Sequence, residues 1–371
     1  MKSKISLFGL IVFLSIFSFG QNTVSPDIPL SEFNMSNISS PAFVLINESP
    51  SEVYVPENLK ALVVHSTSNF KGGLSVELMP YYYINTESKD RNFLKFVGIK
   101  KTGERVSQNP FSGLNTTTIS FAYANKEFEN FLDDERKVFS VGARTKLLRF
   151  YNKQEMVDYD QRVSKILQDI DWPPHIVTQA NEANTEEERS KILNNYLESD
   201  EGKAKIGALL KKLEIYKKPI KPIFQMDGAI GYSTLFKENE INSATVNRLG
   251  IWLTSEFSLI LNKDSEKSKS NNYFNFFIVG RYVEDGFVND GSKLYYRDFG
   301  GKIELELGKM SFSYEYINRY GNEKGSRSVG NIGLLISKDI SLIGGFGKDF
   351  SSEDNLIALF GINWGVNFNN N

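Results

Sequence analysis

Hydrophobic and polar residues alternate along much of this chain, beginning near residue 74. The clearest stretch sets Leu249, Ile251 and Leu253 on one side, with Arg248 and Gly250 on the other. Successive side chains of a β-strand point to opposite faces, so this pattern predicts strands with one apolar and one polar face. Eleven segments show it, and they lie near residues 74–82, 117–123, 139–147, 224–236, 249–259, 274–282, 299–307, 312–316, 329–337, 340–348 and 355–368.

Segment length separates the two folds that share this alternation. Most segments run over roughly 9–15 residues, and a strand that crosses a membrane needs about 9–11. A soluble β-sandwich would alternate in the same way, but its strands are usually about 5–6 residues long. We therefore predict an all-β fold, a transmembrane antiparallel β-barrel.

The number of strands should be even, as it is in single-chain bacterial barrels. We therefore expect about twelve strands, within a range of roughly ten to fourteen. The missing strand would lie near Phe93–Lys100 or within residues 41–70, where Asn58–Val64 could also form a short helix.

A helical period interrupts the strands at residues 152–221. Thr185 and Glu188 have the spacing of a capping box, and one apolar helix face is predicted from Ile206, Leu209, Leu210 and Leu213. Loops of this length are usually functional or disordered, although helices that pack only on themselves would explain the pattern equally well. Three strands before the insertion would make it extracellular, and four would make it periplasmic.

The first twenty residues have the layout of a secretory signal peptide. Lys2 and Lys4 precede an apolar run, and Ser18 and Gly20 are the small residues expected before a cut at Gln21. The apolar run of about 15 residues is short for a membrane-spanning helix, which needs about 20. We expect a signal peptide at 1–20, a periplasmic leader or plug-like segment at 21–70, and a barrel at 71–371 that the insertion 152–221 interrupts. The protein would then lie in the outer membrane of a Gram-negative bacterium.

Composition agrees with this assignment and excludes several alternatives. Aromatic residues make up 13% of the chain, which suits strands that face lipid. The mean hydropathy of −0.31 argues against a helical membrane bundle. The absence of cysteine excludes disulfides and thiolate metal sites. A net charge of −2 gives no indication of nucleic-acid binding.

Short motifs near the N-terminus resemble those of uncharacterised outer-membrane β-barrels of Gram-negative bacteria. They are Ser40-Pro41-Ala42-Phe43, Ser49-Pro50, Pro56 and Leu78-Met79-Pro80-Tyr81-Tyr82. The match covers about 45 residues, and Tyr82-Tyr83 departs from it where a pair containing Trp is expected. The resemblance implies an N-terminal segment that docks near a barrel, and it implies no activity.

The polar faces of the predicted strands carry five basic and six acidic residues that should point into the barrel. They are Arg144, Lys146, Arg248, Arg281, Lys302, Glu77, Asp227, Glu256, Glu304, Glu306 and Glu315. Such a set could line a charged channel or solute site, but near balance favours a lumen filled by paired charges. On the apolar faces, Ile251, Leu253, Leu305 and Phe360 should contact lipid.

Enzyme chemistry finds little support. The two histidines, His65 and His175, show no metal-ligand spacing and lie in no convincing strand. Without a nucleophile beside a base or a phosphate loop, we expect no catalytic residue, metal or cofactor.

Two functions remain open. One is a narrow, weakly selective channel or transporter for small solutes. The other is a non-conducting barrel that anchors or scaffolds a cell-envelope complex through residues 152–221. The expected partners are outer-membrane lipid, the barrel-assembly machinery and an envelope protein bound at the insertion.

Overall fold

The computed structural model describes residues 40–46, 49, 51–53, 62–67, 73–84, 96–102, 105–128, 131–156, 158, 173–183, 185, 188–189, 191–192, 195–196, 199–205, 221–236, 241–261, 272–287, 292–337, 339–350 and 356–366. The chain divides into two compact units. One comprises Pro29–Lys153 with Lys218–Asn371, and the other comprises Met1–Ile28 with Gln154–Lys217. The predicted signal peptide at 1–20 lies outside the described residues.

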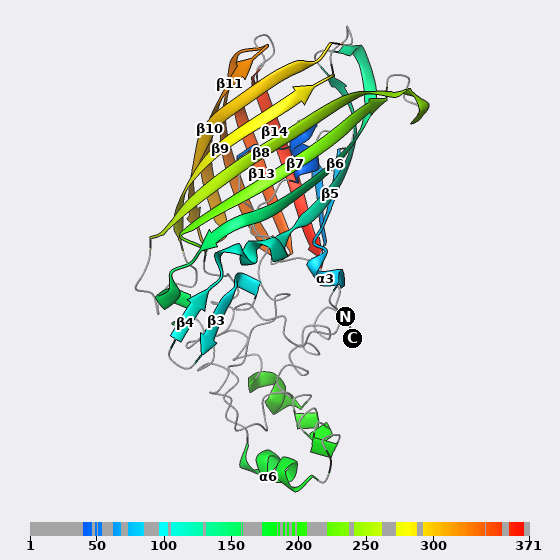
Figure 1. Ribbon diagram of the computed structural model, residues 1–371. Helices are drawn as coiled ribbons and strands as arrows, with labels where there is room; N and C mark the ends of the chain where they lie inside the picture. The colour runs from blue at the N-terminus through cyan, green and yellow to red at the C-terminus, as the bar shows by residue number, and fades with distance from the viewer. Residues whose placement is uncertain are drawn as a thin grey trace. The chain divides into compact units, whose positions relative to one another are not determined.

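Twelve of the described strands close into one antiparallel β-barrel, which confirms the predicted fold (Figure 1). Each strand pairs with its neighbours in the chain, and β1 pairs with β14 to close the ring. The strands are β1 Leu62–Thr67, β2 Leu74–Leu78, β5 Thr118–Phe128, β6 Phe131–Phe150, β7 Phe224–Phe236, β8 Ala244–Ile260, β9 Tyr273–Asp285, β10 Leu294–Leu307, β11 Met310–Gly321, β12 Gly325–Ser337, β13 Ile340–Lys348 and β14 Leu356–Val366.

The strand missing from the sequence pattern is β1, within residues 41–70. The barrel therefore begins at Leu62, so the predicted boundary at 71 and a helix reaching Val64 are both wrong. His65 also lies in a strand, contrary to expectation. The short run Leu62-Val63-Val64 has adjacent apolar residues instead of alternation. It becomes a strand because β2 and β14 pair with it on both sides.

Smaller elements outside the barrel follow β2. Pro80 has no backbone N–H for a ladder, and β2 ends two residues before it, so the predicted strand 74–82 is shorter than expected. The chain continues into α3 Tyr81–Ile84, the hairpin of β3 Ile99–Thr102 with β4 Arg105–Gln108, and the 3₁₀ helix η2 Pro110–Thr116. In the stretch Phe93–Lys100, the described residues 96–100 lead into this hairpin and do not form a barrel strand.

The two rims of the barrel differ in what they carry. We call the rim where β1 begins and β14 ends the terminal rim, and the other the opposite rim. Four barrel strands precede the insertion, so the chain leaves β6 and re-enters β7 at the terminal rim. The long connection from β2 to β5 starts and ends there too. Connections at the opposite rim are short, including η4 Ile241–Ser243 between β7 and β8.

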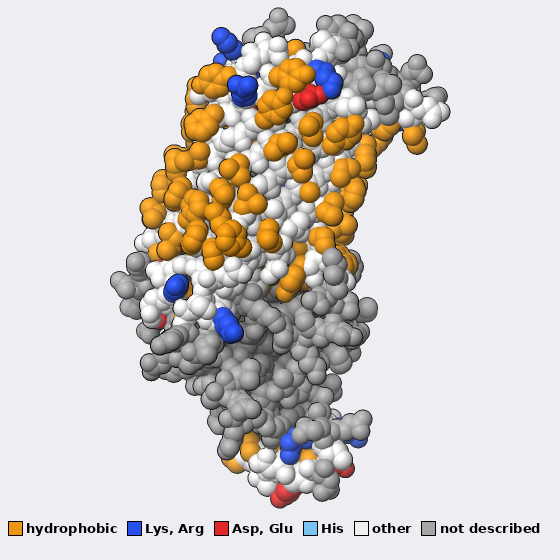
Figure 2. All heavy atoms as spheres, viewed as in Figure 1, with side chains coloured by type: hydrophobic (Ala, Val, Ile, Leu, Met, Phe, Trp, Pro, Cys, Tyr) orange, Lys and Arg blue, Asp and Glu red, His pale blue; other side chains and the backbone are white. Residues whose placement is uncertain are grey.

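Apolar side chains cover the outer wall of the barrel. Figure 2 shows hydrophobic side chains across this wall, with lysine and arginine side chains at the edges of the area. Ile251, Leu253 and Phe360 are 49%, 43% and 40% exposed, and Leu305 is half-buried. Along β10 this face is apolar from Phe299 to Leu307, about 27 Å of strand, and Arg297 lies beyond it toward the opposite rim.

Aromatic side chains mark both ends of the apolar wall. Near the terminal rim, the rings of Phe150, Phe224 and Phe257 follow one another across three strands at 6.1 and 4.8 Å. Near the opposite rim, Tyr282 and Tyr295 stack at 6.4 Å. This distribution matches the aromatic girdles of membrane barrels.

The second unit contains helical segments. Helix α6, Pro174–Glu182, begins after Pro173 with proline at its first position, where the missing N–H costs nothing. Thr185 Oγ1 accepts a hydrogen bond from Glu188 N at 3.1 Å, as its predicted capping role requires. The predicted apolar face of Ile206, Leu209, Leu210 and Leu213 lies outside the described residues.

Candidate functional site

An N-terminal segment occupies the interior of the barrel. We call its described residues, 40–46, 49 and 51–53, the plug. It contains the helix α2, Pro41–Leu45, which starts at Ser40: the Ser40 hydroxyl accepts from Phe43 N at 3.2 Å, and proline follows at the first helical position. The Ser-Pro-Ala-Phe motif is therefore a helix start.

The plug helix is wholly buried against the inner wall of β5–β8. Phe43 and Ile46 pack with apolar residues of β5, β6 and β7, and Val44 packs on Trp252. Each of the four side chains at 43–46 is at most 3% exposed. At about 1.5–3 kcal/mol for each buried side chain, burial contributes about 6–12 kcal/mol to holding the helix in place.

A row of glycines makes room for this helix. Gly142, Gly231 and Gly250 lie opposite one another on β6, β7 and β8. A Cβ at Gly142 would come within 2.7 Å of Pro41 Cβ, and one at Gly250 within 2.8 Å of Leu45 Cδ1. Side chains at these positions would occupy the volume that α2 fills.

Hydrogen bonds fix the first half of the plug to the wall. The hydroxyls of Ser40 and Ser75 lie 2.6 Å apart, and Ala42 N donates to Ser120 Oγ at 3.2 Å. At the end of α2, Arg248 donates to the carbonyl oxygen of Leu45 at 2.9 Å.

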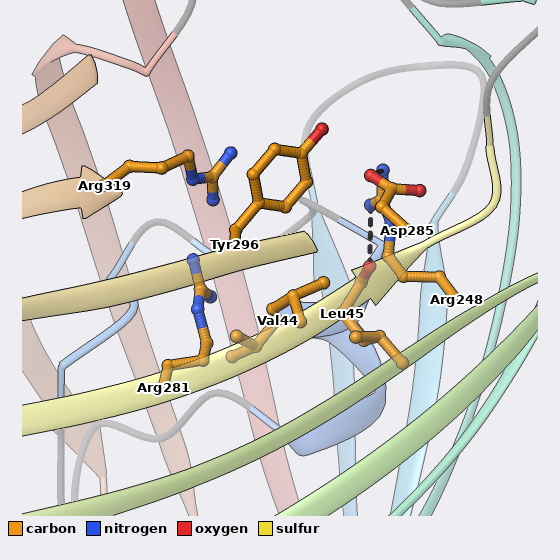
Figure 3. A pocket seen from close by; sticks show the side chains of 8 residues that line it. Val44, Leu45, Arg248, Arg281, Asp285, Tyr296 and Arg319 are labelled. Carbon is orange, nitrogen blue, oxygen red and sulfur yellow. Dashed lines mark hydrogen bonds and ion pairs between the residues drawn. The ribbon is translucent and has the colours of Figure 1, made fainter. Parts of the chain in front are cut away.

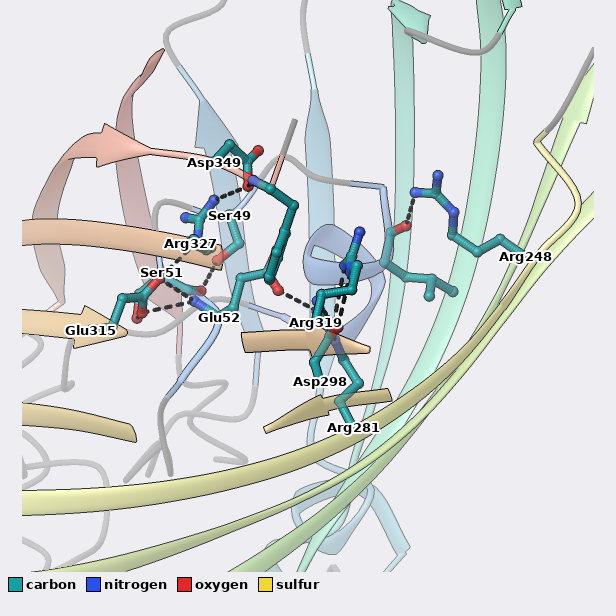
Figure 4. Close-up of polar contacts among 12 residues, drawn as sticks. Ser49, Ser51, Glu52, Arg248, Arg281, Asp298, Glu315, Arg319, Arg327 and Asp349 are labelled. Carbon is teal, nitrogen blue, oxygen red and sulfur yellow. Dashed lines mark hydrogen bonds and ion pairs between the residues drawn. The ribbon is translucent and has the colours of Figure 1, made fainter. Parts of the chain in front are cut away.

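The second half of the plug is held by charged groups on the far side of the lumen. Ser51 Oγ donates to Glu315 at 2.8 Å, and the carboxylate of Glu52 pairs with Arg281 (Figure 4). Val53 is buried among apolar side chains of β9 and β11. The plug therefore bridges opposite walls of the barrel.

These anchoring charges belong to a larger network. Asp298 lies between two guanidinium groups, 2.6 Å from Arg281 and 2.9 Å from Arg319. Arg327 pairs with Glu315 at 2.9 Å and with Asp349 at 3.0 Å. Buried charges of opposite sign satisfy each other here, as their removal from water requires.

A second network lies beside the closing strand β1. Arg144 pairs with Glu77 at 2.7 Å, and Thr118 donates to the same carboxylate. His65 lies 3.4 Å from Glu77 and 2.8 Å from Asn363 on β14. The network thus joins β1, β2, β5, β6 and β14, where the barrel closes through its two shortest strands.

A third network lies near the terminal rim. Lys221, at the end of the insertion, donates to Glu256 and Glu306. Gln225 donates to Glu256 at 2.5 Å, and Asn275 donates to Glu306 at 2.9 Å. The network fixes the point at which the chain re-enters the barrel.

All eleven charged residues predicted for the lumen lie on its inner face. Besides those in the networks above, Lys302 is 3.2 Å from Glu304 and covers the ring of Phe277. Asp227 is buried beside Lys146 in the β6–β7 register. The eleven do not form one site, because they are divided among separate clusters.

The sequence interpretation missed further charged residues of the barrel interior, some on the strands, others in the plug or next to a strand end. In the described chain they are Arg149, Arg319, Arg327, Asp285, Asp298, Asp349, Lys221 and Glu52. Asp298 could have been found, since it stands an even number of residues before Lys302 on the same strand. Arg319 could have been found by extending the β11 pattern past Tyr316. Nothing in the local sequence points Glu52 into a barrel.

A small recess remains between the plug and β8–β11. It has a volume of about 30 Å³ and is lined by Val44, Leu45, Arg248, Arg281, Val283, Asp285, Tyr296 and Arg319 (Figure 3). Arg319 stacks on Tyr296 at 4.4 Å and on Phe350 at 3.8 Å. Arg248 pairs with Asp285 at 2.6 Å.

Two features are absent from the part of the chain that the structure describes. No group of three or more histidine, aspartate or glutamate side chains is placed to hold a metal ion. No described helix is long and apolar enough to cross a membrane.

Comparison with known proteins adds no assignment to this geometry. No protein-family model and no curated protein matches the chain.

Proposed function

We propose that this protein is an outer-membrane β-barrel that its own plug keeps closed, and that it anchors the segments at its terminal rim. The plug carries the proposal, because its apolar helix fills one side of the lumen and its Ser51–Glu52 end reaches the other. The apolar outer wall and its aromatic ends support a membrane location.

The terminal rim would face the periplasm, as both chain ends of bacterial barrels do. Membrane barrels usually have short periplasmic turns and longer extracellular loops, and in this orientation the chain would have the reverse arrangement. The insertion and the β2–β5 connection both start and end at the terminal rim. An envelope protein bound there is the partner that this arrangement favours, besides membrane lipid and the machinery that inserts barrels.

Fractionation tests the location. We expect a heat-modifiable protein in the outer-membrane fraction, with an N-terminus at Gln21. Recovery of a soluble periplasmic protein would contradict the proposal.

Planar bilayers test closure and anchoring together. The intact protein should show little conductance and little ion selectivity. Deletion of residues 154–217 keeps the barrel unit intact, including Lys221. It should leave conductance unchanged and release a copurifying partner. A large rise in conductance would identify the insertion as a lid, and a large selective conductance of the intact protein would overturn closure.

A narrow channel for small solutes is the second candidate. It is favoured by the hydrogen bonds that link the plug to the wall and by the small recess beside the plug. In this case the plug must leave its seat for conduction. The chain has no cysteine, so the double substitution Ser40→Cys and Ser75→Cys places one designed disulfide where the hydroxyls are 2.6 Å apart. Openings that vanish on oxidation and return on reduction would favour the channel. Openings that persist in the oxidised protein would exclude plug movement.

A further inference from the structure

Basic side chains outnumber acidic ones in the lining of the recess between the plug and β8–β11. Three of its eight lining residues are arginines, on β8, β9 and β11, and one is an acid, Asp285. Asp298 and Glu52, whose carboxylates pair with Arg281, do not line the recess. Figure 3 shows the side chains of Arg281, Arg319 and Tyr296 converging on this space.

Arg319 has hydrogen-bonding capacity left over. A guanidinium carries five N–H donors, and Asp298 accepts from Nε at 2.9 Å and from Nη2 at 3.0 Å. The side chain is 16% exposed. Stacking on Tyr296 and Phe350 holds the guanidinium plane in one orientation without using these donors.

The volume of the recess limits the size of the anion that it can hold. The recess measures about 30 Å³, and a cavity of about 10–15 Å³ holds one water molecule. It therefore has room for a small planar head group and excludes a large one. A carboxylate is planar and matches the two-pronged donor geometry of arginine. The rest of such a ligand would extend out of the recess.

The floor of the recess is the plug itself. Val44 and Leu45 line it, and Arg248 donates to the carbonyl oxygen of Leu45 at 2.9 Å. Arg281 lines the recess and also pairs with Glu52 of the plug. A carboxylate that attracts Arg281 therefore competes with Glu52 for the same guanidinium.

We propose that this recess binds the carboxylate group of a small organic acid through Arg319 and Arg281, and that binding weakens the hold of Arg281 on the plug. The proposal rests on the proposed closed barrel, in which the plug is the floor of the site. It adds a ligand class and a link between ligand and plug.

Thiol reactivity measures the charge in the recess. Because the chain has no cysteine, Val283→Cys places one thiol in the lining at little change of size. The folded protein in detergent is treated with anionic and cationic methanethiosulfonate reagents. We expect the anionic reagent to react several-fold faster, relative to Asn242→Cys, an exposed control in the β7–β8 connection. Equal or faster reaction of the cationic reagent would overturn the proposal.

Acetate is the ligand probe, with chloride at equal ionic strength as its control. Acetate should slow modification at position 283 at least twofold more than chloride, and it should leave position 242 unchanged. Arg319→Lys should retain the preference for the anionic reagent but lose the protection by acetate, because lysine lacks the planar fork. Protection that is equal for acetate and chloride, or unaffected by Arg319→Lys, would refute carboxylate binding.

The thiol test uses the folded protein in detergent, so its result does not depend on where the protein lies in the cell. A protein that fractionates as soluble fails the location proposal, whatever the recess binds. A heat-modifiable barrel without acetate protection fails the ligand proposal alone.

Discussion

Gly142 is the position where one methyl group should do most to unseat the plug. A Cβ there would lie 2.7 Å from Pro41 Cβ and 2.9 Å from both Ala42 N and Ser120 Oγ. Two of these atoms belong to a proline ring and to the backbone of α2, which cannot rotate away. Gly142→Ala must therefore move the helix or distort β6.

The magnitude follows from two contributions. Overpacking in a filled interior costs about 1–3 kcal/mol, and loss of the Ala42–Ser120 hydrogen bond costs about 1 kcal/mol. Together they oppose the seated plug by about 2–4 kcal/mol. Burial of the α2 side chains, at about 6–12 kcal/mol, is larger, so the plug should stay seated most of the time. The fraction of molecules in which the plug has left this position should rise by roughly 30- to 900-fold.

Hydrogen exchange at the plug measures this fraction. Phe43 N and Val44 N donate to the carbonyl oxygen of Ser40 within α2, and they should exchange faster by the same factor in Gly142→Ala. Openings in planar bilayers should become more frequent in parallel if the plug blocks conduction.

Two glycines give matched controls. A Cβ at Gly280 would meet nothing within 4 Å, so Gly280→Ala should leave exchange at Phe43 unchanged. A Cβ at Gly231 would meet the movable end of Leu45 at 3.1 Å, so Gly231→Ala should have a smaller effect than Gly142→Ala. Equal exchange at Phe43 in Gly142→Ala and Gly280→Ala would show that the glycine row is not the seat of the plug.

Three further predictions concern the wall and the insertion. Glu77→Gln removes the carboxylate that pairs with buried Arg144 and should lower the free energy of unfolding by about 3–5 kcal/mol in urea titrations. A double variant with Arg144→Met should recover much of that loss, and no recovery would show that the pair is not coupled. Leu253→Arg puts a charge on the apolar outer wall and should cost about 2–4 kcal/mol in refolding into lipid; an unchanged stability would mean that this face does not meet lipid. Thr185→Ala removes the cap that accepts from Glu188 N and should destabilise its helix by about 1 kcal/mol, seen as faster exchange at Glu188, and unaltered exchange would rule out the cap.

The alternation of hydrophobic and polar residues predicted most of the strands that form the barrel wall. Because side chains of a strand alternate between faces, the sequence alone indicated eleven of the twelve strands and the inner position of residues such as Glu256 and Lys302. It did not indicate β1, because a strand this short is set by its neighbours and carries no clear period of its own. The end of β2 had a local signal in Pro80, but the alternation continues past it to Tyr82 and predicted a longer strand.

Only the tertiary structure decided which charged residues pair with each other inside the lumen. The alternation of side chains predicts that Arg281 points inward. The register of β9 with β10 then places Asp298 opposite it. Glu52 reaches the same guanidinium from 229 positions away in sequence, as the numbering shows. Pairing across such separations has no local signal, because it depends on how strands are staggered around the closed barrel.

The seat of the plug shows the same division. Ser40-Pro41 carries the local signal for a helix start, and that signal is visible in the sequence. The glycines of β6–β8 look like any other strand glycines until the register aligns Gly142 with Gly231 and Gly250. Only the closed barrel makes them one hollow, because an absent side chain matters only when another part of the chain comes to fill its space.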